Sequence, residues 1–121
     1  MLLRGDRIRI EMEFEVAEDL PGLDVALLVT SSSGARVVDE MMSDRSSVRL
    51  SPGRYRVALT VPALLNVGDY TAGVWFGTPY EDLFDLPMAA PFTVHGSDLE
   101  RPDRVLVLDV PFALERLDPA P

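Results

Sequence analysis

Cysteine and lysine are absent from this chain of 121 residues, and histidine occurs once, as His95. Because a reactive thiol, a Schiff-base lysine and a lysine-dependent phosphate loop need these residue types, the sequence excludes the corresponding chemistry. A zinc site built from cysteine and histidine is excluded for the same reason. Without cysteine there is no disulfide framework either, so the fold must depend on its hydrophobic core.

Positive charge and long apolar runs are also scarce. Eleven basic residues, all arginine, stand against twenty acidic ones, which gives a formal net charge of -9. Such a surface repels phosphate backbones and anionic lipid headgroups. No apolar stretch approaches the roughly 20 residues of a membrane span, and residues 1–6 lack the apolar region of a signal peptide. We therefore expect a soluble chain with no nucleic-acid partner, no membrane insertion and no targeting signal.

The length and composition indicate one ordinary globular domain. A chain of 121 residues can build a single hydrophobic core, and its 47% hydrophobic and 26% charged residues exclude a disordered or fibrous class. We expect one domain over residues 1–121, with a core at about 5–96 and a C-terminal extension with a further strand at about 100–114.

Strict alternation marks residues 7–16, with apolar residues at even positions and charged residues at odd positions. A period of two predicts a strand with one face in a core and the other in water. The apolar positions are Ile8, Ile10, Met12, Phe14 and Val16. The charged positions are Arg7, Arg9, Glu11, Glu13 and Glu15.

Similar short patterns, separated by turn residues, recur along the chain. They predict strands at residues 23–30, 35–42, 54–61, 69–76 and 88–94. A long loop is expected at 78–87, a turn at 95–98, a charged link at 100–104 and a frayed end at 118–121. The apolar run 105–110 fits a strand buried on both faces or one lying against a partner chain. Seven or eight strands without a helical period predict an antiparallel β-sandwich of immunoglobulin-like or jelly-roll type.

One segment is more specific than alternation. Leu64, Leu65, Gly68 and Tyr70 have the spacing of the corner that crosses between the sheets of immunoglobulin-like sandwiches, where the tyrosine hydroxyl bonds to nearby backbone. Around this corner, the order of features resembles the C-terminal domain of Wzt-type ATP-binding subunits of polysaccharide (O-antigen) ABC transporters, over about residues 5–96. These features are Gly5-Asp6, Ser33-Gly34, Val37-Val38, Ser51-Pro52-Gly53, Gly68-Asp69-Tyr70, Asp82, Asp85 and Pro91-Phe92-Thr93-Val94.

The resemblance implies a β-sandwich, commonly dimeric, that binds the end of a lipid-linked glycan and so licenses its export. It implies no catalysis and no cofactor in this domain, because the ATPase is a separate one. The implied partners are the polysaccharide, the ATP-binding and membrane subunits of the transporter and a second copy of the chain. The implied location is cytoplasmic, peripheral to the inner membrane through the transporter.

Sugars are bound by stacking on aromatic rings and by polar side chains that take paired hydroxyls. Trp75 is the best aromatic candidate, because alternation places it on the wet face with Thr71 and Gly73, where small neighbours leave room for a ligand. The alternative is that Trp75 packs in the core and Phe76 points outward, or that both are buried near the end of the strand.

The loop residues after Trp75 have a composition suited to a sugar rim, with Tyr80 beside Asp82 and Asp85. The alternative is that Phe84 plugs the end of the sandwich and the carboxylates are only solvated. Calcium binding and glycosidase chemistry are the other uses of such carboxylates, but the EF-hand pattern and any sign of a deep cleft are missing. We therefore expect neither a metal nor an enzyme.

Arg56 and Glu11 complete the candidate set, on strands that alternation predicts to be half exposed. They either line a sugar groove or form cross-strand ion pairs. His95 has no neighbouring nucleophile and is not expected to be catalytic. The sequence thus predicts a non-catalytic carbohydrate-binding domain, with a ligand-free structural or protein-interaction spacer as the alternative. The exposure of Trp75 distinguishes the two.

Overall fold

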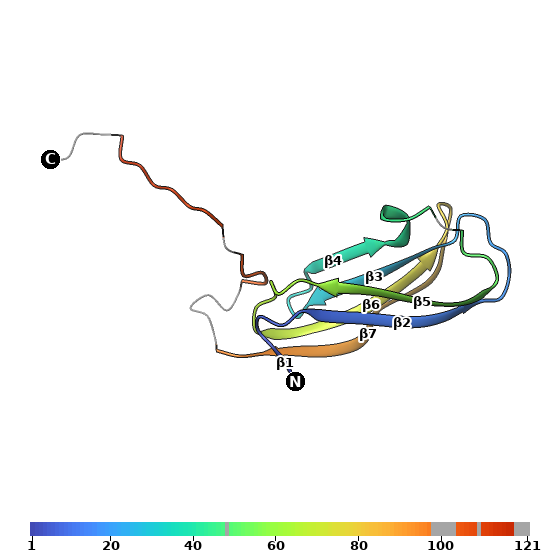
Figure 1. Ribbon diagram of the computed structural model, residues 1–121, viewed down its shortest axis with the longest axis horizontal. Coiled ribbons are helices and arrows are strands. Elements are labelled where there is room, and N and C mark those ends of the chain that lie inside the picture. The colour runs from blue at the N-terminus through green and yellow to red at the C-terminus, as the bar shows by residue number, and fades with distance from the viewer. Residues whose placement is uncertain (48, 98–103, 109, 118–121) are drawn as a thin grey trace.

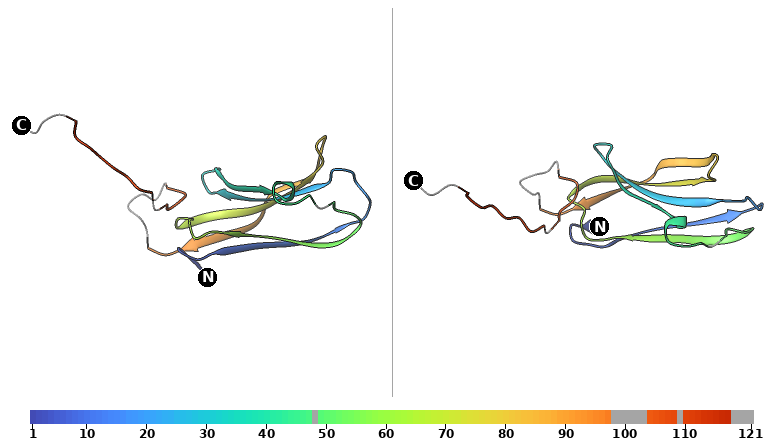
Figure 2. Two further views of the ribbon diagram at one scale, coloured as in Figure 1. Left: turned by 45° about the horizontal axis from the view of Figure 1, so that its top comes forward. Right: turned by 90° about the horizontal axis from the view of Figure 1, so that it is seen from above.

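The computed structural model describes residues 1–47, 49–97, 104–108 and 110–117, which form a two-layer β-sandwich (Figures 1 and 2). A five-stranded sheet of order β1-β7-β6-β3-β4 packs on a two-stranded sheet, β2-β5. The predicted all-β sandwich is confirmed, although the short β1 pairs in parallel with β7. The strands are β1 (Leu2–Leu3), β2 (Ile8–Val16), β3 (Asp24–Ser31), β4 (Arg36–Met41), β5 (Gly53–Val61), β6 (Gly68–Gly77) and β7 (Asp82–His95).

The alternating segment forms β2 as predicted. It pairs with β5 in an unbroken antiparallel register from Ile8 opposite Val61 to Val16 opposite Gly53. Both ends of its apolar face are buried, and the charged residues between them are exposed. The apolar face of β2 therefore covers one side of the core.

Strand β3 lies in the interior of the larger sheet, between β4 and β6. Val25, Leu27 and Val29 belong to the core between the sheets. Ala26 and Leu28 lie on the opposite face, yet each is only 3% exposed. This strand is therefore covered on both sides, which the sequence pattern did not predict.

The expected loop at residues 78–87 is wrong, because β7 begins at Asp82. Residues 78–81 alone connect β6 to β7, closed by a hydrogen bond from the Thr78 amide to the Glu81 carbonyl of 2.9 Å. The first ten residues of β7 are exposed. Since neither face of this edge segment is buried, no hydrophobic alternation marks it in the sequence.

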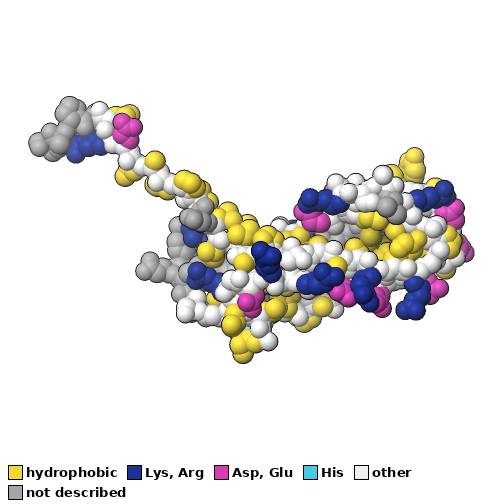
Figure 3. All heavy atoms as spheres, viewed as in Figure 1, with side chains coloured by type: hydrophobic (Ala, Val, Ile, Leu, Met, Phe, Trp, Pro, Cys, Tyr) yellow, Lys and Arg dark blue, Asp and Glu magenta, His cyan; other side chains and the backbone are white. Residues whose placement is uncertain are grey.

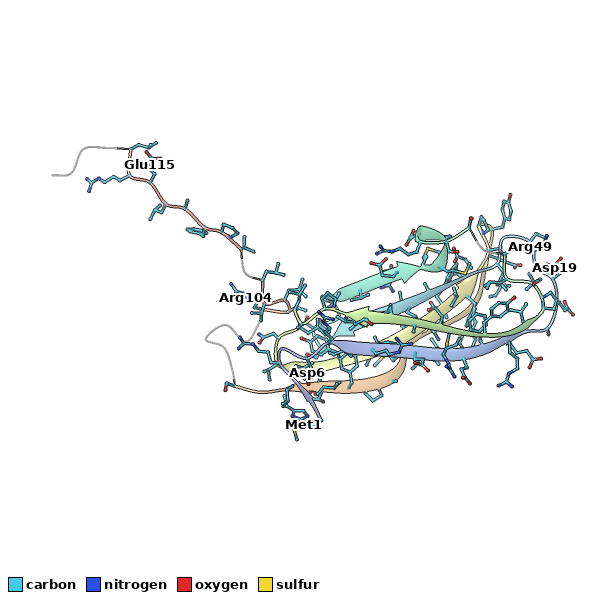
Figure 4. All side chains as sticks on the ribbon, in the orientation of Figure 1. Met1, Asp6, Asp19, Arg49, Arg104 and Glu115 are labelled. Carbon is cyan, nitrogen blue, oxygen red and sulfur yellow. The ribbon has the colours of Figure 1, made fainter. Side chains whose placement is uncertain are left out.

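The described residues of 105–110 do not form a strand buried on both faces; they form one isolated bridge, between Leu65 and Leu106. The alternative, a strand lying against a partner chain, stays a prediction. The Asn66 amide donates to the Val105 carbonyl at 2.9 Å, and the Val107 amide donates to the Leu64 carbonyl at 2.6 Å. Figure 4 shows Arg104 beside the sandwich and Glu115 far from it. Most of the expected link at 100–104, the end of the turn at 95–98 and the expected frayed end at 118–121 lie outside the described residues.

The tyrosine corner is confirmed. The Tyr70 hydroxyl donates a hydrogen bond of 2.7 Å to the carbonyl of Asn66. Tyr70 is 5% exposed and Asn66 is 2% exposed. Burial raises the pKa of Tyr70, which favours the protonated hydroxyl that this bond requires. The side chain of Asn66 in turn donates to the Arg104 carbonyl at 2.7 Å.

Within the residues that the structure describes, no helix has the length and apolar character needed to cross a membrane.

We expect Tyr70→Phe to lower the free energy of unfolding by about 1–2 kcal/mol, because the buried Asn66 carbonyl loses its donor while the ring still packs. Urea denaturation followed by circular dichroism measures this loss. Tyr55→Phe is the matched control, since the Tyr55 hydroxyl donates to the Ser51 carbonyl at an exposed site where water can replace it. Equal losses in the two variants would contradict the prediction, because the corner would then add no more stability than an exposed hydrogen bond.

Candidate functional site

The outer face of the five-stranded sheet, which points away from the core, carries Trp75 at its centre. In register, Trp75 of β6 lies opposite Ala26 of β3 and Asp85 of β7. Ala26 lies opposite Met41 of β4. Because directly opposed residues share one face of a sheet, these four side chains form a row across it. The predicted face of Trp75 is confirmed: Tyr70 and Val74 lie in the core, and Trp75 does not.

A cavity of about 320 Å³ opens on this face. Its volume is at the small end of the range for ligand pockets, roughly 300–1,000 Å³. It contains three of the six predicted site residues, namely Trp75, Asp82 and Asp85. The full lining is Ala26, Leu28, Arg36, Asp39, Met41, Trp75, Asp82 and Asp85.

Two contacts hold the half-buried indole of Trp75. Its Nε1 donates a hydrogen bond of 2.8 Å to Oδ1 of Asp82. The ring lies over Gly77, where an added β-carbon would collide with the ring and would come within 2.8 Å of the Glu81 carbonyl. The absence of a side chain at Gly77 therefore determines where the ring can lie.

A bulge in β7 borders this region. Ala72 pairs with Ala90 and Val74 pairs with Leu86, so residues 87–89 lie opposite Gly73 alone. The backbone of Pro87 is so close to Gly73 that a β-carbon there would lie 2.7 Å from the Pro87 Cα. Inserted residues of this kind bend an edge strand toward its neighbour.

A second cavity, of about 460 Å³, is lined by residues of the same face, including Thr30, Thr71 and Met88. Arg36 lines both cavities. The two hollows are therefore neighbours along the sheet, which leaves room for a ligand longer than the first cavity.

The charged groups of the first cavity differ in how they are paired. Nη1 of Arg36 lies 3.4 Å from Oδ2 of Asp39, and both side chains are about half exposed. Asp82 accepts the bond from Trp75. Asp85 is exposed, and its carboxylate has no hydrogen-bond or ion-pair partner among the described residues. Polar acceptors are thus available on both sides of the indole.

Arg56 and Glu11 lie on the other sheet, so the core separates them from Trp75. The cross-strand ion pairs are confirmed: Arg56 Nε is 3.2 Å from Glu11 Oε1, and Arg56 Nη2 is 2.6 Å from Glu13 Oε1. A hydrogen bond from Arg9, together with the charge of Arg56, lowers the pKa of Glu11. Figure 3 shows acidic and basic side chains side by side over β2 and β5.

Tyr80 lies in the connection between β6 and β7 and is 95% exposed, but it does not line the cavity. Phe84 is half exposed, and its ring centroid lies 6.2 Å from that of Phe76. The predicted plug formed by Phe84 is therefore a partial one.

Sequence reasoning missed Arg36, Asp39 and Met41, which β4 contributes. The register of β4 on β3 shifts between Val29 and Thr30, so counting from the hairpin does not give their face. The available signal was that Asp39 and Met41 alternate with Val38 and Glu40 within a strand-like segment.

Over the described part of the chain, no group of three or more histidine, cysteine, aspartate or glutamate side chains is placed to hold a metal ion. Asp82 and Asp85 accordingly have no third acidic partner for such a site.

The fold and the site therefore define the class of protein: an all-β sandwich with a cavity on the outer face of its larger sheet. No protein-family model and no curated protein matches the sequence. Among solved structures, the chain is similar to the C-terminal domain of Wzt, with a TM-score of 0.73 and 20% identity over 94% of this chain and 73% of that one. The similarity confirms at the level of the fold the resemblance that the sequence motifs indicated.

Gly77→Ala is expected to displace the indole and break its bond to Asp82, at a cost of about 1–3 kcal/mol in the free energy of unfolding. Because Trp75 is the only tryptophan, a shift of the fluorescence emission maximum reports this displacement directly. Gly34→Ala is the control: it strains a residue of positive φ with no atom near its β-carbon. It should lower stability without moving the emission. Unchanged emission in Gly77→Ala would contradict the described ring position.

Proposed function

We propose that this chain is a non-catalytic carbohydrate-binding domain that recognises the end of a lipid-linked, O-antigen-type polysaccharide for export by an ABC transporter. The observation that carries the proposal is the cavity that brings Trp75 together with Asp82, Asp85 and Arg36. An aromatic ring beside planar polar groups is the combination that sugar recognition needs. The fold similarity to the C-terminal domain of Wzt supports the same function.

In the proposed complex, the apolar face of a sugar stacks on the indole, which Asp82 and Gly77 hold in place. Asp85 accepts hydrogen bonds from ring hydroxyls, and Arg36 donates to ring oxygens. The neighbouring hollow takes the next sugar of the chain. Because few atoms are buried and each hydroxyl loses bound water, one site binds only in the range of about micromolar to millimolar.

The proposed partners rest on the fold similarity to the C-terminal domain of Wzt. The absence of lysine, and so of a lysine-dependent phosphate loop, is consistent with ATP hydrolysis in a separate domain of the transporter. The domain of residues 1–121 would act in the cytoplasm, peripheral to the inner membrane through the ATP-binding and membrane subunits.

The proposal includes a homodimer. A crevice of about 550 Å³ lies between β4 and β5, and core residues such as Leu27 and Val57 are part of its lining. Val110, Phe112 and Leu114 alternate along the extended C-terminal segment, and their exposures are 64%, 92% and 91%. In Figure 1 this segment extends away from its own sandwich. Covering the crevice of a second copy would remove both apolar surfaces from water, and two linked sites would bind a polymer more tightly.

The glycan proposal is tested by titrating the chain with O-polysaccharide from its source strain while the fluorescence of Trp75 is recorded. We expect a saturable change that an unrelated glycan does not produce. Calorimetry should show binding at least about tenfold weaker in Trp75→Ala and Asp85→Asn, a loss of about 1.4 kcal/mol. Glu15→Gln removes a charge from the other sheet and is the matched control.

The same titration decides the role of the remaining predicted residues. Tyr80→Ala and Arg56→Gln should bind normally, because neither side chain lines the cavity. Weaker binding in either variant would extend the site beyond the cavity. No change with millimolar sugar and a folded protein would instead favour the ligand-free spacer.

Removal of residues 109–121 is expected to convert a dimer into a monomer, because the segment that covers the second copy is lost. Light scattering after size-exclusion chromatography measures the mass at several concentrations. Phe112→Ser with Leu114→Ser in the full chain should weaken the dimer too, while Glu115→Gln should not. A full-length chain that is monomeric at about 100 μM would contradict the dimer.

A further inference from the structure

The charges of the cavity that contains Trp75 do not balance. Its lining includes three aspartates and one arginine, a formal charge of −2. Arg36 is already paired with Asp39. The remaining negative charge therefore belongs to Asp82 and Asp85, which lie on β7.

Both of these carboxylates are next to the indole. Asp82 accepts the hydrogen bond from Trp75 Nε1, and Asp85 is the direct cross-strand neighbour of Trp75. No described arginine other than Arg36 lines the cavity. A sugar stacked on the ring would thus carry its substituents into a negative field that no unpaired cation in the described lining offsets.

From this arrangement we infer that the cavity selects glycan residues that are uncharged or carry an amine, and rejects those that carry a carboxylate or phosphate. The inference rests on the proposed function and adds the chemical class of the ligand. Asp82 and Asp85 are the residues that determine this selectivity, and Asp39 contributes by neutralising Arg36. The pairing by Asp39 is decisive, because a free Arg36 would attract the anions that the two carboxylates repel.

The size of the effect follows from Coulomb's law. Two like charges about 4 Å apart in water disfavour binding about fivefold, so two carboxylates together disfavour an anionic sugar by more than about tenfold at low salt. The effect should shrink at 1 M salt, where the Debye length is only about 3 Å. Measurements at low and high salt can therefore separate the selectivity that comes from charge from the selectivity that comes from the shape of the cavity.

The electrostatic field at the indole can be measured without any glycan. Because Trp75 is the only tryptophan, all tryptophan fluorescence comes from this site. Caesium ions should quench its fluorescence more, and iodide less, than uncharged acrylamide does, each relative to a free tryptophan derivative. Asp82→Asn and Asp85→Asn should raise iodide quenching at least about twofold at low salt. Asp39→Asn should also raise it by releasing Arg36. Glu15→Gln removes one charge from the other sheet and should have no effect.

The same variants are then compared for binding to two ligands by calorimetry. One is the O-polysaccharide of the source strain, and the other is the same polymer with its primary hydroxyls oxidised to carboxylates. We expect the oxidised polymer to bind at least about tenfold more weakly, and this difference to shrink at high salt and in the combined Asp82→Asn, Asp85→Asn variant.

Three outcomes would overturn the inference: equal binding of both polymers, tighter binding of the oxidised polymer, or iodide quenching that the aspartate variants leave unchanged. If neither polymer binds and quenching behaves as expected, the proposed function fails while the charge selectivity of the cavity stands. The two failures are therefore distinguishable.

Discussion

The pairing of β3 with β6 is the contact on which both the core and the cavity depend. Its register is unbroken from Asp24 opposite Gly77 to Ser31 opposite Tyr70. One face of this pair supplies the core, and the other supplies the floor of the cavity through Ala26, Leu28 and Trp75. Because side chains alternate with a period of two, a slip of one residue would exchange the faces. The packing of the core thus also positions the indole.

The strands that flank the β3–β6 pair contribute the polar side chains of the cavity walls. The walls of the hollow come from β4 and β7, and each of these strands shifts its register on its inner neighbour. The bulge in β7 brings the Pro87 backbone over Gly73, and β4 and β7 contribute the polar side chains that line the cavity. In this respect the molecule combines a rigid, buried pair of strands with irregular flanking strands, a common way to hold binding groups in place.

The parts that sequence reasoning predicted are those where burial imposes a simple rule. Strand β2 was predicted because its apolar face is covered and its charged face is not, and the corner was predicted from Tyr70 and its spacing. The start of β7 was missed because its side chains are exposed on both faces. Residues 105–110 have a strand-like composition, but those of them that the structure describes form one isolated bridge. Arg36 and Asp39 were missed because the register of β4 on β3 shifts at a bulge, so their face cannot be counted from the hairpin.

The prolines of β7 have a consequence for how the molecule behaves at high concentration. Through most of its length β7 is an edge strand, since β1 pairs with it only at Val94 and His95. Such an edge would normally invite pairing with other molecules and the growth of fibrous aggregates. Pro87 and Pro91 have no N–H to donate, which interrupts the row of hydrogen-bonding groups along that edge. The strand that carries Asp82 and Asp85 can therefore remain open to water without becoming a template for aggregation.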